Sequence, residues 1–153
     1  MMELTPLLTL DVELAPPVEI GRTSAGVRRV IPIVGGNFAG PEMSGTIVPG
    51  GADWNLARPD GITHLWARYT LRTDDGAFIM ITNEGWGTQD DERMQRIFDG
   101  EQQPEEGWYC RTHPRFEVDL DGPVAWLNDI VCVGSLRPPR RPDRITVDIY
   151  QAQ

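Results

Sequence analysis

The sequence contains no lysine, only two histidines and two cysteines, and no long run of hydrophobic residues. All 14 basic residues are arginine, and 23 acidic residues bring the formal net charge to −9. A mean surface this negative repels nucleic-acid phosphates and anionic membranes, so neither is expected as a partner. Because His64 and His113 are the only imidazoles, a histidine-rich metal site is excluded, and no metal is expected.

Targeting signals and cysteine pairs are equally scarce. No stretch approaches the roughly 18 apolar residues of a membrane-spanning helix. The segment Met1–Pro6 lacks the charged and apolar regions of a signal peptide, so a cytoplasmic protein is expected. Cys110 and Cys132 are therefore expected to be reduced, with a disulfide between neighbouring strands as the alternative.

The chain length indicates one domain. At 153 residues, of which 40% are hydrophobic, the chain can build a core without help from a disulfide or a metal. It shows no internal repeat, linker or change in composition. We therefore expect residues 1–153 to form a single domain.

The pattern that recurs is an alternation of apolar and polar residues with period two, which is typical of half-buried β-strands. Pro16-Pro17 interrupts the first such stretch, Gly35-Gly36 ends the second, and Pro49–Gly51 ends the third. The predicted strands are 8–14, 27–33, 45–48, 64–73, 77–83, 109–118, 125–133 and 145–150.

One short helix is predicted near residues 89–99. Thr88 is placed to cap it, Met94, Ile97 and Phe98 form an apolar stripe, and Gly100 is placed to end it. The proline-rich run 137–142 is expected to be a stiff loop, with a polyproline ligand for a partner as the alternative. Together these elements predict an all-β domain, an antiparallel β-barrel of about eight to ten strands. A sandwich is the alternative, but a barrel removes exposed edges and offers a lumen for a ligand.

The segment Asp74-Asp75-Gly76 predicts a three-residue hairpin loop that pairs Thr73 with Ala77. A two-residue loop would shift every pair by one. One face of this hairpin then holds the pairs Leu71/Ile79, Tyr69/Ile81 and Ala67/Asn83. The other face holds Arg72/Phe78, Thr70/Met80, Arg68/Thr82, Trp66/Glu84 and His64/Trp86. In one interpretation the first face is core and the second faces solvent; in the other, the second face lines a ligand pocket.

Phosphate-binding glycine loops, dinucleotide-binding patterns and serine nucleophile elbows are all missing, which leaves acid–base chemistry without a cofactor. His64 is a candidate general base. Asp53 lies in a glycine-rich bend where partial burial would raise its pKa. Arg68 or Arg111 would stabilise a developing anion. Each of these residues also has a plain structural explanation: an exposed histidine, an aspartate that caps a turn, or an arginine in a surface ion pair.

Several blocks resemble the bacterial and fungal family catalogued as domain of unknown function 3237. They are Gly35–Pro41, Pro49–Trp54, Arg68–Gly76, Arg111–Glu117 and Trp126–Asn128, in the same order over nearly the full length. The resemblance implies a single-domain antiparallel β-barrel and little about activity. The positions that match those kept in the family's pattern are Asp53, Trp54, Arg68, Tyr69, Asn83, Arg111, Trp126 and Asn128. His64, Trp66 and Val124 depart from that pattern, which would adapt a lumen to a flat aromatic molecule or reflect drift.

Three functions remain open. The first is a cofactor-independent isomerase, cyclase or lyase that acts by proton transfer on a small aromatic or polyketide-like molecule in the lumen. Its catalytic residues would be His64, Asp53 and Arg68. Its substrate-binding residues would be Trp54, Trp66, Tyr69, Asn83, Glu84, Arg111, Trp126 and Asn128. The second is a carrier that uses the same pocket without chemistry, and the third is an interaction module with a filled lumen. A homodimer is compatible with such a barrel, although no segment marks an interface.

Overall fold

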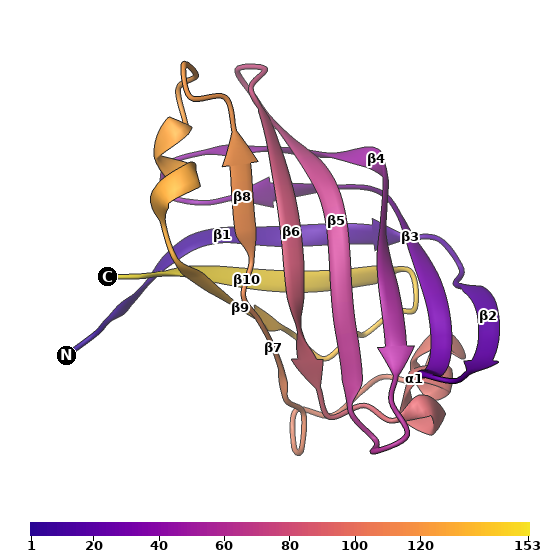
Figure 1. The fold of residues 1–153 in the computed structure, drawn as a ribbon. Helices are drawn as coiled ribbons and strands as arrows, with labels where there is room; N and C mark the ends of the chain where they lie inside the picture. Colours follow the sequence, from indigo (N-terminus) through magenta and orange to yellow (C-terminus); the bar gives the residue numbers. More distant parts are fainter.

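A computed structural model describes all residues 1–153 as a closed barrel of eight antiparallel strands with two additional strands (Figure 1). The elements in chain order are β1 Leu4–Leu14, β2 Val18–Thr23, β3 Gly26–Ala39, β4 Ser44–Ala57, β5 Thr63–Thr73, β6 Phe78–Gly87, α1 Asp91–Phe98, β7 Cys110–Thr112, β8 Arg115–Val118, the 3-10 helix η1 Ala125–Asp129, β9 Cys132–Leu136 and β10 Arg144–Ala152. Around the barrel the strands run β1-β10-β9-β7-β6-β5-β4-β3, and β3 pairs again with β1 to close the ring. The barrel predicted from the period-two pattern is confirmed.

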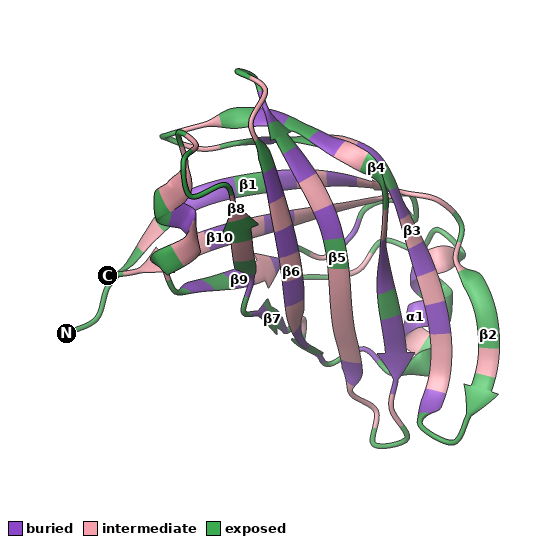
Figure 2. Ribbon diagram, turned by 45° about the horizontal axis from the view of Figure 1, so that its top comes forward, coloured by how far each residue is buried: buried purple, intermediate pink, exposed green.

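The two additional strands lie outside this ring. β2 pairs only with β3, and most of its residues are exposed (Figure 2). β8 pairs with β6 beyond the end of β7, so β7 and β8 together cover the same edge of β6. The predicted strand 109–118 is thus broken at His113-Pro114, where proline has no N–H to give to the ladder.

β3 and β4 are longer than predicted because they continue through the segments that were expected to end them. β3 runs through Gly35-Gly36, and a shift of register there lets its second half pair with β1. A Cβ atom at Gly36, whose φ is +124°, would lie 2.1 Å from the Asp11 carbonyl oxygen. Only glycine allows this close approach of β1 to β3, so the apparent strand breaker is what closes the barrel.

Two other predictions were wrong. The predicted strand 125–133 is η1 followed by β9, which begins only at Cys132. The helix cap is Asp90, not Thr88: an Asp90 side-chain oxygen accepts from the Arg93 N–H at 2.8 Å. The Thr88 hydroxyl instead lies near the Gly107 and Tyr109 carbonyls.

The β5–β6 hairpin has the predicted register. Thr73 N–H donates to the Ala77 carbonyl, Leu71 lies opposite Ile79, and His64 lies opposite Trp86. Buried and less buried residues alternate along both strands (Figure 2). The face with Leu71, Ile79 and Ile81, all fully buried, points into the barrel, and the face with His64 and Arg68 points away from it.

Helix α1 closes one end of the barrel. Its Met94 and Ile97 are buried against Ile31 of β3, with Phe98 and Trp108 packed around them. Gly100 follows the helix with a φ of +91°, as its predicted role requires. The run 137–142 is a loop beside this end, and neither helix of the chain is long and apolar enough to cross a membrane. Cys110 and Cys132 are buried free thiols.

Candidate functional site in the barrel lumen

A cavity of about 110 Å³ lies inside the barrel beneath α1. Fifteen of its 25 lining residues are hydrophobic. A dry apolar cavity of roughly 150 Å³ is known to hold benzene, so this space is somewhat smaller than one that accepts a single ring. Its rim includes Met94, Phe98, Trp108 and the proline-rich loop at Pro139 and Pro142.

Small residues at inward-facing positions create the space. Ala67 stands between Asp53 and Asn83 in one cross-strand row. Gly85 stands opposite Thr112 in the next row, and Thr112 is opposite Gly134. In the first row a small residue separates the two polar side chains, and in the second row glycines flank the polar one, so neither row is filled by large neighbours.

Asp53 is the only acidic side chain of the lumen wall. It is 9% exposed, and its carboxylate accepts from the Trp66 N–H at 3.0 Å and from Asn55 Nδ2 at 3.1 Å. Burial raises the pKa of Asp53 from 3.8 to about 6, although these two hydrogen bonds and the charges of His64 and Arg28 act in the opposite direction. At neutral pH the group is therefore close enough to its pKa to gain and lose a proton.

Asn55 suits both protonation states of this carboxyl group. Its Nδ2 donates to Asp53, while its Oδ1 is buried without a partner. Rotating the amide by half a turn would bring Oδ1 to the position from which it accepts the proton of a neutral Asp53. The pair thus offers a hydrogen bond to either form, which is useful to a group that exchanges protons.

Three further polar groups face the lumen. Asn83 Oδ1 and Thr112 Oγ1 are buried without hydrogen-bond partners. Tyr69 is 5% exposed, and both burial and the charge of Asp53 raise the pKa of its hydroxyl. Tyr69 therefore remains a protonated donor throughout the physiological range.

The raised pKa of Asp53 predicts how stability depends on pH. The folded state prefers the protonated carboxyl, so its stabilising contribution is complete below about pH 3.8 and is lost as the pH rises through about 6. Asp53→Asn should remove this dependence. Wild type should therefore lose stability relative to the variant as the pH rises. The free energy of unfolding of the variant minus that of wild type should increase by about 2 to 3 kcal/mol between pH 4 and pH 7.5.

Urea unfolding of both proteins at the two pH values measures this shift. Comparing the two proteins cancels the opposite contribution of Asp148, whose pKa is lowered by hydrogen bonds from Arg137. An unchanged difference between the two pH values would show that the Asp53 carboxyl titrates normally in the fold.

The outer face of the same wall carries the other predicted catalytic residues. Since Thr63, Leu65, Ala67 and Tyr69 line the cavity, the alternate residues His64, Trp66 and Arg68 point to the opposite side. The structure therefore does not bring His64 and Arg68 together with Asp53 in the lumen. The same alternation places Glu84 and Trp54 outside, because Asn83, Asp53 and Asn55 point inward.

These outer residues form a cluster of their own. His64 Nε2 lies 2.7 Å from Glu84 Oε2, and His113 Nε2 lies 3.7 Å from Glu84 Oε1. Trp86 lies between the two imidazoles, with ring centroids at 5.7 Å from His64 and 5.8 Å from His113. Trp54 and Trp66 are neighbours at 5.5 Å, and Arg68 lies against the Met80 sulfur.

The last three predicted site residues do not line the cavity either. Arg111 lies over the Tyr109 ring, and its guanidinium donates to the Cys110 carbonyl. The Asn128 amide bonds the backbone of Val118 and Ala125, which fixes η1 against β8. Trp126, on η1, is 37% exposed.

The lumen therefore brings together Asp53, Tyr69 and Asn83 from the predicted set. It adds Asn55 and Thr112, which were not predicted from the sequence. Period two was the signal that would have found Asn55, since it stands two residues after Asp53 and shares its face.

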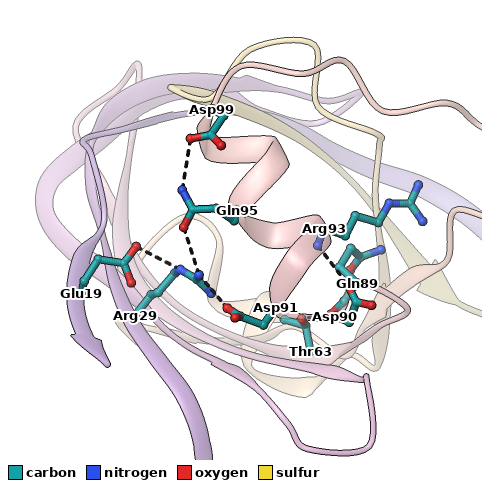
Figure 3. A network of polar contacts seen from close by, with 9 residues as sticks. All are labelled: Glu19, Arg29, Thr63, Gln89, Asp90, Asp91, Arg93, Gln95 and Asp99. Carbon is teal, nitrogen blue, oxygen red and sulfur yellow. Dashed lines mark hydrogen bonds and ion pairs between the residues drawn. The ribbon is translucent and has the colours of Figure 1, made fainter. Parts of the chain in front are cut away.

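Polar contacts hold α1 over its end of the barrel, the end that we call the entrance (Figure 3). Arg29 of β3 bonds Glu19 of β2 at 3.1 Å and Asp91 of α1 at 2.7 Å. The Thr63 hydroxyl donates to the Gln89 carbonyl, and Gln89 Nε2 donates to the Tyr109 carbonyl at 3.2 Å. These contacts attach both the helix and the segment that leads into it to the rim of the barrel.

The fold and the site together define the class of this protein: it is a closed β-barrel with an ionisable group in a largely apolar lumen. Its family is shown by a family model described as "Protein of unknown function (DUF3237)", which matches residues 2–152. The chain belongs to this family, which confirms the resemblance seen in the sequence.

Solved and curated relatives agree over the whole chain. A UPF0311 protein of Rhodopseudomonas palustris is 34% identical over 150 residues, covering 98% of this chain and 96% of the relative. A crystal structure of a conserved protein from the same organism has a TM-score of 0.88 at 34% identity, covering 100% of this chain and 99% of that one. A β-barrel-like protein of Acinetobacter baumannii has a TM-score of 0.83 at 35% identity, covering 100% and 97%.

Two more distant similarities involve Penicillium herquei. A hydroalkoxylation enzyme of this fungus is 29% identical over 76 residues, which is half of each chain. A crystal structure of an enzyme from the same fungus has a TM-score of 0.71 at 20% identity, covering 99% of this chain and 95% of that one. The second similarity shows the fold alone.

Proposed function

We propose that this protein is a cofactor-independent enzyme that binds a small, mostly apolar molecule in the barrel lumen and transfers protons to and from it through Asp53. The observation that carries the proposal is the buried Asp53 carboxyl, whose pKa is about 6, on the wall of an otherwise largely apolar cavity. A carboxyl in such surroundings exchanges protons near neutral pH. The reaction class is an isomerisation, a cyclisation or the reverse elimination.

Addition of a hydroxyl group across a carbon–carbon double bond is the member of this class that the partial similarity to a hydroalkoxylation enzyme favours. Neutral Asp53 donates its proton to one alkene carbon, and the other carbon becomes cationic. The substrate hydroxyl oxygen then forms a bond to that carbon and returns its proton to the Asp53 carboxylate. Atoms and charge balance, and the carboxyl ends as it began, so the step needs no oxidant or reductant.

The surroundings of Asp53 favour this sequence. The newly formed carboxylate is stabilised by the Trp66 N–H and by Asn55, and its negative charge lies beside the developing cation. The apolar lining excludes water, which would otherwise capture the cation in place of the substrate hydroxyl.

The test uses 2-(2-methylallyl)phenol, whose alkene gives a tertiary cation when protonated, incubated with the protein in deuterium oxide. We expect 2,2-dimethyl-2,3-dihydrobenzofuran with one deuterium in a methyl group, because the added proton comes from a carboxyl that exchanges with solvent. Mass spectrometry and NMR measure both the conversion and the label. A probe that binds and is recovered unchanged and unlabelled would instead support the carrier function.

His64→Ala is the matched control for this assay. Its imidazole lies on the outer face of the wall, paired with Glu84, so the rate should stay within about twofold of wild type. A rate reduced 100-fold or more would show that His64 takes part in catalysis and would contradict the proposal that the reaction takes place in the lumen.

A further inference from the structure

We infer that Asn83 and Thr112 form a second polar subsite in the lumen that recognises a hydroxyl group, so that the substrate is a neutral ring compound with at least two hydroxyl groups. This inference rests on the proposed function for the location of the substrate, and it adds what the substrate must carry. One hydroxyl would lie near Asp53 and another at the new subsite.

Asn83 has an amide with nothing in the protein to bind. The residue is 5% exposed, and its Oδ1 is buried without a hydrogen-bond partner. A buried amide left unpaired lowers stability, so proteins seldom keep one unless water or a ligand completes it. The side chain borders the cavity, so the missing partner belongs there.

Thr112, on the neighbouring strand β7, also has a buried polar atom without a partner. Its hydroxyl is buried without a partner, and it too borders the cavity. A Cβ atom at Gly134, which is paired with Thr112 in the barrel wall, would lie 2.2 Å from this hydroxyl oxygen, so the glycine leaves the hydroxyl its space. A valine of the same shape would have filled the position without leaving a polar atom unpaired, so packing does not explain the threonine.

A hydroxyl group is the ligand chemistry that suits both residues. The Asn83 amide presents an acceptor at one end and a donor at the other, and the Thr112 hydroxyl is both. A substrate hydroxyl donates and accepts, so it satisfies them in either orientation of the amide.

The spacing of the wall fits a single ring between the two polar positions. Asp53 and Asn83 are two strands apart with Ala67 between them, about 10 Å from backbone to backbone. Side chains that point inward from both positions leave room for one ring that carries a substituent toward each. A ring with two separated hydroxyl groups therefore reaches both at once.

The experiment compares three probes of nearly equal shape: m-xylene, m-cresol and resorcinol. Hydrophobic transfer alone ranks them in that order, with m-xylene bound most tightly. The subsite predicts the reverse order in the wild-type protein, with each hydroxyl worth about five- to tenfold in Kd. The Trp108 ring at the rim of the cavity supplies a fluorescence signal, and ligand-observed NMR supplies an independent one.

Two variants place the effect at the subsite. Asn83→Leu and Thr112→Val keep the shape of the wall and remove its polar atoms, so each should weaken resorcinol by about fivefold and leave m-xylene unchanged or tighter. Thr70→Val is the matched control, because Thr70 lies on the outer face of β5 and should not affect any probe.

The outcomes separate this inference from the proposed function. If m-xylene binds wild type best, if no probe binds, or if Thr112→Val and Asn83→Leu leave the order unchanged, the subsite does not exist. If resorcinol binds best and both variants remove that preference while 2-(2-methylallyl)phenol is never converted, the subsite stands and the proposed chemistry falls.

Discussion

Asp53→Asn is expected to lower kcat for 2-(2-methylallyl)phenol by two to four orders of magnitude, the usual effect of removing a general acid. An asparagine keeps the size of the side chain: its Oδ1 can accept from the Trp66 N–H, and its Nδ2 can donate to Asn55 Oδ1 once the Asn55 amide is turned round. It has no proton to give at any accessible pH. Binding of the three ring probes should therefore stay within about threefold of wild type while turnover is lost.

The wild-type pH profile supplies an independent measurement of the same group. Because the neutral carboxyl is the proton donor, kcat should fall tenfold per pH unit as the pH rises above about 6. Asp53→Asn should show no such limb in its residual rate. A variant that retains more than a tenth of the wild-type kcat, or a wild-type profile that is flat from pH 5 to pH 8, would contradict the role of Asp53.

The fold was largely predictable because strand alternation is a local signal. The hairpin pairs from Thr73/Ala77 to His64/Trp86 follow from one turn, Asp74-Asp75-Gly76, together with the period of two. The elements that were missed depend on distant partners. β3 continues through Gly35-Gly36 because β1 approaches there, and no local pattern contains that information.

The site was harder to predict than the fold because alternation gives two faces without saying which faces inward. The aromatic and charged residues His64, Trp66 and Arg68 resembled a pocket, and they lie on the outer face. The lumen face contains small and plain residues such as Ala67 and Thr112. Their importance comes from unpaired atoms and open volume, which exist only once the barrel has closed.

The largest effect on stability is expected at the entrance, where Arg29 is 3% exposed while its partners Glu19 and Asp91 are 48% and 52% exposed. Because of this difference in exposure, removing the carboxylates and removing the guanidinium should have different effects on stability. Removing both carboxylates in Glu19→Gln/Asp91→Asn leaves a buried guanidinium without a counter-charge, which is strongly destabilising. Removing the guanidinium in Arg29→Met leaves two carboxylates that water can hydrate, and the methionine can still pack on the Phe98 ring.

We therefore expect the double variant to lose about 3 kcal/mol of unfolding free energy, or about 6 to 12 °C in Tm, and Arg29→Met to lose no more than about 1 kcal/mol. Glu92→Gln is the matched control, because its ion pair with Arg96 lies on the exposed face of the same helix and contributes less than about 0.5 kcal/mol. Hydrogen exchange of the α1 amides should accelerate in the double variant, since Asp91 ties this helix to the barrel. If Arg29→Met loses as much as the double variant, the ion pairs stabilise the entrance beyond what burial of the arginine costs. In that case α1 opens only when those pairs break, and ligand entry into the lumen should slow as the salt concentration falls.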